Sequence, residues 1–273
     1  MAARERIGLI AGSGIFPRLF AEAARKQGLE VIAVAHRGET DDSLAPHVDS
    51  LSWVRVGQID GIVGAFRAAG VSRAVMAGGI GRVKALTQAR PDVGAIRIVA
   101  RLRSFRDDAL LRAVADHFER EGITIVAPTD FVKELLAPEG RLAGPELNAV
   151  QSKDVALGVE VAGALGKADV GQTVVVRQGH VLALEAVEGT DETIRRGGKL
   201  GGDGAVVVKL AKSGQDERFD LPAVGVKTLE TMREVGARVL AVETGRTILL
   251  EPDRLIAEAE KHRISLVGTR RGN

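Results

Sequence analysis

The 273-residue sequence contains no cysteine and no tyrosine. Its aromatic side chains, apart from histidine, are seven Phe and one Trp. The absence of cysteine excludes disulfide bonds, thiolate metal sites and a cysteine nucleophile. Because aromatic side chains are scarce, a core must be built mainly from Ala, Val, Leu and Ile, which favours layered α/β packing over an aromatic-rich β-sandwich. No run of about eighteen apolar residues is present, and no signal-peptide h-region precedes Gly12. We therefore expect a cytoplasmic protein without a membrane-spanning segment.

Charge of one sign is not in large excess either, since the formal net charge is only +2. This total does not indicate nucleic-acid binding. The distribution is uneven, because one segment of the first half contains six arginines, namely Arg90, Arg97, Arg101, Arg103, Arg106 and Arg112. The segment is either a solvated helix face or a patch that meets an anionic substrate or membrane headgroups. The five histidines are scattered and have no spacing typical of a His-rich metal site.

The first half alternates between short apolar runs and helical patterns. The run 6–11 stops at a glycine turn, residues 16–27 have helical spacing, and the run 31–35 follows, which together predict a βαβ unit. The alternation continues with predicted strands at 51–54, 73–76 and 123–126 and predicted helices at 59–69 and 109–121. This pattern predicts an α/β fold in which residues 1–137 form an N-terminal Rossmann-like domain with an open, mostly parallel sheet.

The second half has a different texture. Residues 137–146 are rich in Pro and Gly, so 138–150 is the best candidate for a linker. Beyond it we expect a distinct C-terminal α/β or α+β domain at 151–273. It should contain a helix at 151–165, a hairpin within 174–186, strands at 206–210, 239–242 and 247–249, and helices at 227–235 and 252–262.

Two glycine turns follow predicted strands of the first half and are candidates for binding a phosphate. The first contains Gly12, Ser13 and Gly14, and the second contains Gly78, Gly79 and Ile80. Small residues at the start of a helix let backbone N–H groups approach phosphate oxygens, and parallel strands open their turns at one edge of the sheet. A tight turn without a ligand is the alternative. An NAD site is disfavoured, because the third glycine of the dinucleotide fingerprint is absent and the second strand runs into His36-Arg37.

The second half concentrates ionisable residues in two segments, 185–196 and 209–222. Hydrolysis of a pyrophosphate needs cations that neutralise phosphoryl oxygens and carboxylates that hold Mg²⁺ or orient water. Both kinds of group are present in these segments. Taken singly, each of these residues could equally be a solvated surface charge. Serine hydrolysis is disfavoured, since the Gly-Ser-Gly turn is not a Gly-x-Ser-x-Gly elbow.

Together these motifs resemble the LpxI family over residues 7–267, nearly the whole chain. The segments that carry the resemblance are Gly8–Pro17, Ala77–Gly81, Asp169–Gln172, Glu185–Asp191 and Gln215–Pro222. The most specific are Glu-Gly-Thr-Asp and Gln-Asp-x-Arg-Phe-Asp-x-Pro. One departure is visible, because the family pattern Lys-Pro-x-Gln-Asp reads Lys212-Ser213-Gly214-Gln215-Asp216 here. It changes a turn and not a charge.

The resemblance implies an enzyme that hydrolyses UDP-2,3-diacylglucosamine to UMP and 2,3-diacylglucosamine 1-phosphate (lipid X) in lipid A biosynthesis. It also implies dependence on Mg²⁺, a product held between the two domains, and a homodimer. A substrate with two acyl chains leads us to expect peripheral contact with the inner membrane and no nucleic-acid partner.

Within this hypothesis the residues divide by role. The carboxylates of Asp191, Asp216 and Asp220 are candidates for binding metal or orienting water, with Asp220 the first choice. Arg195, Lys209, Lys212 and Arg218 would stabilise phosphate charge. Gln215, Thr190 and the two glycine turns would bind substrate. Two rival classes remain, a Rossmann-type oxidoreductase and a non-catalytic nucleotide-sugar binding protein.

Overall fold

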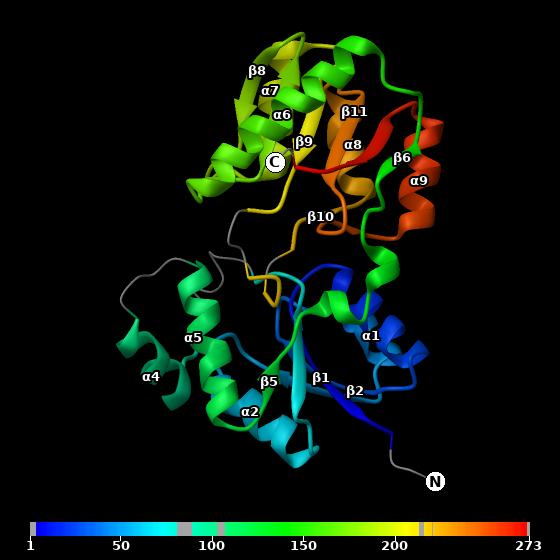
Figure 1. The fold of residues 1–273 in the computed structure, drawn as a ribbon. Coiled ribbons are helices and arrows are strands. Elements are labelled where there is room, and N and C mark those ends of the chain that lie inside the picture. Colours follow the sequence, from blue (N-terminus) through cyan, green and yellow to red (C-terminus); the bar gives the residue numbers. More distant parts are fainter. Residues whose placement is uncertain (1–3, 81–88, 103–106, 213–215, 220, 272–273) are drawn as a thin grey trace. The chain divides into compact units, whose positions relative to one another are not determined.

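The computed structural model describes residues 4–80, 89–102, 107–212, 216–219 and 221–271. The chain forms two compact units (Figure 1). The first comprises Met1–Lys133 and Asp216–Asp220, and the second comprises Glu134–Gln215 and Leu221–Asn273. None of the helices in the described part of the chain is long and apolar enough to cross a membrane.

The sheet of the first unit is parallel throughout. Its strands lie in the order β3 (Ser50–Val54), β2 (Glu30–His36), β1 (Arg6–Ala11), β4 (Arg73–Ala77) and β5 (Thr124–Ile125). The chain order reverses at β1, as in a Rossmann-like sheet, and turns after the strands therefore meet at the carboxyl edge. The predicted N-terminal Rossmann-like domain is confirmed.

The helices of the first unit are α1 (Phe16–Lys26), α2 (Ile59–Ala68), α4 (Val93–Arg101) and α5 (Asp107–Arg120), and short 3₁₀ turns occur at Asp42–His47 and Pro128–Asp130. Alternate residues of β1 and β2, such as Ile10 and Ile32, pack with Phe66 of α2 and Phe118 of α5 in one core. Figure 1 shows α5 beside β5. On the other face α1 packs on β1, β2 and β4 and buries Phe20 completely.

The second unit has a mixed six-stranded sheet. Its order is β6 (Gly140–Ala143), β13 (Ser265–Thr269), β11 (Val239–Glu243), β9 (Val206–Lys209), β7 (Thr173–Arg177) and β8 (His180–Leu184). The three central strands β13, β11 and β9 are parallel, whereas β6, β7 and β8 pair antiparallel to their neighbours. A separate parallel pair joins β10 (Ala223–Val224) to β12 (Ile248–Leu249). The predicted distinct C-terminal α/β domain is confirmed.

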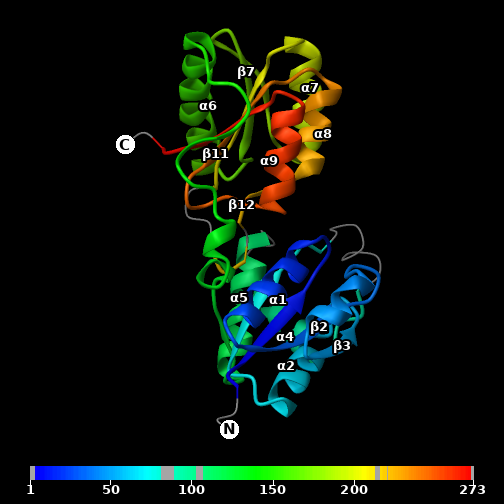
Figure 2. The same cartoon turned by 90° about the vertical axis from the view of Figure 1, so that its right-hand side faces the viewer.

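Both faces of this sheet are covered by helices. The valines of β7 and β9 alternate, so that Val174 and Val208 pack with α6 (Ala149–Lys167). Val175 and Val207 pack instead with α7 (Thr190–Gly201), α8 (Val226–Glu234) and α9 (Pro252–Lys261). The turned view in Figure 2 shows α6 on one side of β7 and β11, with α7, α8 and α9 on the other.

The strands β6, β10 and β13 and the helix α7 were not expected from the sequence. The edge strand β6 lies within residues 138–150, the segment expected to be a linker. The helix α7 occupies residues that were interpreted as a charged loop, although it contains Gly197, Gly198 and Gly201. A Cβ at Gly197 would overlap Val175, and one at Gly198 would overlap Val235. The glycines therefore let α7 approach β7 and α8 closely, which explains why they occur in a helix interior.

Candidate active site

The two glycine turns of the first unit contact each other directly. The Gly12 N–H donates to the Ala77 carbonyl at 2.8 Å, and the Ser13 N–H donates to the Gly79 carbonyl at 2.7 Å. The Ser13 hydroxyl donates to the same Gly79 oxygen at 2.9 Å. These bonds join the ends of β1 and β4 at the carboxyl edge of the sheet, as the sequence indicated.

Glycine is required at two of these positions because the loops lie back to back. A Cβ at Gly12 would overlap the Gly79 carbonyl oxygen. Gly78 has a φ of +84°, and its Cβ would overlap the Ser13 carbonyl oxygen. Ser13 therefore serves here as a loop connector, with its hydroxyl engaged by backbone and not poised as a nucleophile.

The helix α1 starts directly after the first turn without a side-chain cap. Ile15 at the N-cap offers no oxygen, and Pro17 follows in the first turn of the helix. Pro17 has no N–H, and the Arg18 and Leu19 N–H groups donate to the Ile15 carbonyl at 3.1 and 3.2 Å. The Phe16 N–H, at the positive end of the helix dipole, is not satisfied by a capping side chain. Such a helix start favours an anion, which is the chemistry expected of the glycine turn.

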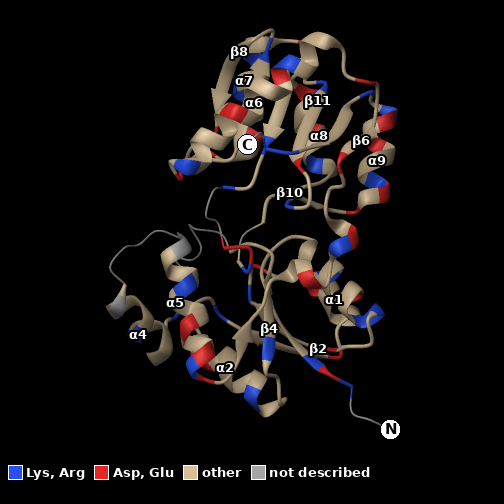
Figure 3. Ribbon diagram, in the orientation of Figure 1, with Lys and Arg blue, Asp and Glu red and all other residues tan. Residues whose placement is uncertain are grey.

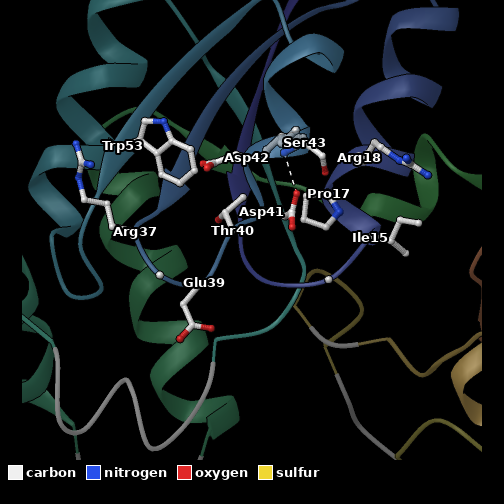
Figure 4. A pocket seen from close by; sticks show the side chains of 13 residues that line it. Ile15, Pro17, Arg18, Arg37, Glu39, Thr40, Asp41, Asp42, Ser43 and Trp53 are labelled. Atoms are coloured by element: carbon white, nitrogen blue, oxygen red, sulfur yellow. Dashed lines mark hydrogen bonds between the residues drawn. The ribbon is translucent and has the colours of Figure 1, made fainter.

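A cavity of about 800 Å³ opens beside this turn. It is lined by Gly14, Ile15, Pro17, Arg18, Arg37, Gly38, Glu39, Thr40, Asp41, Asp42, Ser43, Leu44 and Trp53. These residues follow β1 and β2 or lie in β3, so the cavity covers the β1–β3 half of the carboxyl edge. Figure 4 shows Trp53 and Arg37 on one side and Ile15, Pro17 and Arg18 on the other. In open α/β sheets ligands bind at this edge.

Two buried side chains beside the cavity, Thr40 and His36, form hydrogen bonds with the end of β1. The Thr40 hydroxyl donates to the Ala11 carbonyl at 2.7 Å, and His36 Nδ1 lies 2.9 Å from the same oxygen. Burial lowers the pKa of His36, with the Ala11 hydrogen bond opposing that shift. The imidazole is therefore neutral near pH 7 and donates from Nδ1, because its partner oxygen can only accept. His36 thus positions the loop after β2 and is not a cation in the cavity.

In the second unit, Thr190 and Lys209 lie near one edge of the mixed sheet. Thr190 begins α7, and its hydroxyl donates to Glu185 Oε1 at 3.1 Å and lies 3.3 Å from the Thr173 hydroxyl. Thr173 is in turn the register partner of Lys209, whose ammonium donates to the Ala223 carbonyl at 3.0 Å. Buried Glu243 ends the adjacent strand β11 and accepts the Ala211 N–H at 2.7 Å. A chain of polar groups therefore follows this edge.

The remaining predicted charges of the second unit form ion pairs. Asp191 lies 2.9 Å from Lys227, and Lys212 lies 3.1 Å from Asp169. Arg195 pairs with Glu192 at 2.7 Å and with Glu234 at 3.0 Å. Such partly exposed pairs contribute little to stability, so each can be exchanged for a ligand at small cost.

Asp216 and Arg218 belong to the first unit, although their neighbours in sequence belong to the second. The Arg218 guanidinium donates to both Asp216 oxygens, at 2.9 and 2.7 Å, and these hydrogen bonds hold the pKa of the Asp216 carboxyl below its ordinary value. The guanidinium also lies 4.8 Å from the ring centroid of Phe219, which packs against the core of this unit. The segment is thus anchored by one ring and one bidentate pair.

Gln215 and Asp220 lie outside the described residues. Of the three aspartates predicted to bind metal, Asp191 is in the second unit and Asp216 in the first, each paired with a cation. Among the residues that the structure describes, no group of three or more His, Asp or Glu side chains is arranged to hold a metal ion. The described residues alone do not form a complete Mg²⁺ site, and the metal prediction stays a prediction.

The cavity residues that follow β2 or lie in β3 were not predicted from the sequence. Trp53, Arg37 and Glu39 were not assigned any role, because nothing in their spacing indicates a site. One signal was available: the chain's single Trp lies next to the end of a predicted strand, and the preceding predicted strand runs into His36-Arg37.

The fold and these turns define a two-unit α/β protein with a Rossmann-like first unit, in which a cavity and a helix start lie at the carboxyl edge of the parallel sheet. The LpxI N-terminal domain profile matches residues 6–135, and the LpxI C-terminal domain profile matches residues 138–267. The chain belongs to the LpxI family.

One relative is UDP-2,3-diacylglucosamine pyrophosphatase LpxI of Caulobacter vibrioides, 32% identical over 276 residues that span 96% of this chain and 97% of the relative. Among solved structures, the biotin carboxylase subunit of pyruvate carboxylase matches 68% of this chain and 39% of its own, with 13% identity and a TM-score of 0.27. Similarity at that level assigns no function.

Proposed function

We propose that this protein hydrolyses UDP-2,3-diacylglucosamine to UMP and 2,3-diacylglucosamine 1-phosphate in lipid A synthesis. The observation that carries the proposal is the family match, which covers both halves of the chain. A relative that aligns with 96% of this chain is named for that pyrophosphatase activity. The start of α1 beside a cavity supports the proposal, because the positive end of the helix dipole and the Phe16 N–H favour an anionic group such as a diphosphate.

In the proposed reaction a water oxygen forms a bond to one phosphorus, the P–O bond to the bridging oxygen breaks, and the leaving phosphate keeps the electron pair. The protein's residues would neutralise the phosphoryl oxygens and orient the water. The charged groups named from sequence, Arg195, Lys209, Lys212 and Arg218, are proposed for the first task. Asp220 is proposed for the second.

Mg²⁺ dependence and a homodimer also remain proposals. Mg²⁺ is commonly held by one or two carboxylates together with substrate phosphates, so a three-carboxylate cage is not required. If bound, the ion would supply charge neutralisation at the phosphates.

The direct test measures UMP released from UDP-2,3-diacylglucosamine in detergent micelles, with and without EDTA. We expect release that falls about tenfold or more in EDTA and returns with added Mg²⁺. Unchanged UMP release in EDTA would contradict the proposed metal dependence but not the proposed hydrolysis. Binding of substrate without any UMP release would favour the non-catalytic binding protein.

We further propose that the cavity beside Trp53 receives the nucleoside of the substrate. Its volume of about 800 Å³ is within the range of small-molecule sites. The half-buried Trp53 ring offers a stacking surface for a base, and the carboxylates of Glu39, Asp41 and Asp42 can accept hydrogen bonds from ribose hydroxyls. In this arrangement the diphosphate that follows the nucleoside would lie beside the start of α1.

Because Trp53 is the only tryptophan, its fluorescence reports this cavity alone. Titration with UMP is expected to change the emission in a saturable way. Trp53→Ala should weaken UMP affinity about tenfold by calorimetry, since base stacking on an aromatic ring typically contributes about 1–3 kcal/mol. Trp53→Phe should lose less, because it keeps a ring. UMP release from substrate combined with an unperturbed Trp53 signal would place the nucleoside elsewhere.

A further inference from the structure

The helix α4 exposes three of its large apolar side chains to solvent and buries Gly94, Ala95 and Ile98. Val93 is 57% exposed, Ile96 is 56% exposed and Val99 is 47% exposed, whereas Gly94 and Ala95 are buried and Ile98 is only 4% exposed. A soluble amphipathic helix has the opposite arrangement. We name these three exposed side chains the α4 surface (Val93, Ile96 and Val99).

The helix is held in this orientation by its buried side. Asp92 caps α4 through the Ala95 N–H at 3.0 Å and also accepts the Asp60 N–H at 2.7 Å. Asp60 in return accepts the Gly94 N–H at 2.8 Å. A Cβ at Gly94 would overlap the Asp60 carboxylate, so a larger residue there would displace the carboxylate that accepts the Gly94 N–H. Rotation of α4 to bury Ile96 would break the two bonds that join this helix to Asp60, from the Asp60 N–H to Asp92 and from the Gly94 N–H to Asp60.

The charge around the α4 surface is positive. Arg90 and Arg97 are exposed, and neither has an ion-pair partner in the described part of the chain. The acidic side chains nearest in sequence and contact, Asp92 and Asp60, are occupied by the N–H groups just named. By sequence, residues 82–112 contain eight Arg or Lys against three Asp. In Figure 3 most of α4 is tan, whereas α5 carries both charges.

We propose that the α4 surface docks the protein on an anionic phospholipid bilayer. Apolar side chains beside unpaired arginines suit the interface between headgroups and acyl chains, where the apolar groups insert and the arginines meet lipid phosphates. A symmetric contact with a second copy fits less well, because it would bring the arginines of the two copies together. This inference rests on the proposed function in one respect: a substrate with two acyl chains resides in a membrane, which gives the protein a reason to bind one.

The test is flotation of the protein with vesicles of phosphatidylcholine that contain about one third phosphatidylglycerol, an anionic lipid whose negative surface attracts basic segments. The wild type should float with these vesicles and not with pure phosphatidylcholine. Ile96→Asp should lower the vesicle partition coefficient about tenfold or more, and Arg97→Glu should lower it on anionic vesicles several-fold. The matched controls are Val187→Asp, at an 89% exposed valine of the second unit, and Lys26→Glu at the end of α1. Both controls should float like the wild type.

Three outcomes would overturn the proposal. If the wild type stays in the soluble fraction, or if Ile96→Asp floats normally, the α4 surface does not dock on a bilayer. Conversion of a dimer to a monomer by Ile96→Asp, seen by light scattering without loss of flotation, makes the surface a self-interface. Normal flotation with a raised KM in micelles assigns it to the substrate's acyl chains. UMP release from micellar substrate by Ile96→Asp, expected to equal the wild type, separates failure of docking from failure of the proposed hydrolysis.

Discussion

Asp220→Ala is expected to lose turnover about 100-fold or more while its fold and its affinity for UMP persist. A carboxylate that orients or deprotonates the attacking water typically contributes on that order to the rate. The substitution removes only the carboxylate, and the residues on both sides keep their own anchors. Phe219 packs against the core of the first unit, and the Pro222 carbonyl accepts the Ile248 N–H at 2.8 Å.

The measurement is kcat for UMP release, together with UMP affinity from Trp53 fluorescence. Glu217→Ala is the matched control, because Glu217 is an exposed carboxylate three residues earlier in the same segment. It should stay within about threefold of the wild type. Asp220→Asn keeps the shape of the side chain and should be as inactive as Asp220→Ala. Near-normal turnover in either Asp220 variant would remove this residue from the mechanism.

Gly12→Ala is expected to lower the free energy of unfolding of the first unit by about 2–3 kcal/mol, within the range for overpacking a close contact. The added methyl group would overlap the Gly79 carbonyl oxygen, so the two glycine turns would have to separate. Separation stretches the hydrogen bonds from Gly12 to Ala77 and from Ser13 to Gly79. The same movement displaces Gly14 in the cavity wall, so UMP affinity should fall as well.

Urea unfolding followed by Trp53 emission measures this change, because Trp53 lies in the first unit. Gly79→Ala is the control, since a Cβ there would meet only the Ser13 hydroxyl at 3.6 Å, an ordinary contact. Its effect should be below about 1 kcal/mol. Equal stability of the two variants would show that the back-to-back contact is not tight.

The elements of the first unit could be predicted closely because each one is marked locally. Buried parallel strands are continuous apolar runs, and glycine or proline marks their ends. Strand β1 ends at Ala11 because Gly12 must lie against Gly79, and α1 begins where Pro17 suits a first helical turn. The valine runs 174–176 and 206–208 likewise predicted strands, and the structure packs their alternate residues against helices on both faces of the sheet.

The helix α7 shows where local signals are insufficient. Three glycines and few apolar residues disfavour a helix at 190–201. Packing against Val175 and Val235 needs those glycines, and this tertiary contact outweighs the propensity. The strand β6 could not be predicted for a related reason, because it pairs with β13, more than a hundred residues later in the chain.

The chain's own sequence determined the α/β class, the two glycine turns, the family and the residues proposed for chemistry, because all of these are properties of short segments. Tertiary structure alone decided that Trp53 and Arg37 share a cavity with Gly14, since the sheet order β3-β2-β1 brings three distant loops to one edge. It also decided that Asp216 and Arg218 belong to the first unit and that α4 turns its valines outward. Burial and neighbourhood depend on contacts between residues far apart in the chain, which no local pattern records.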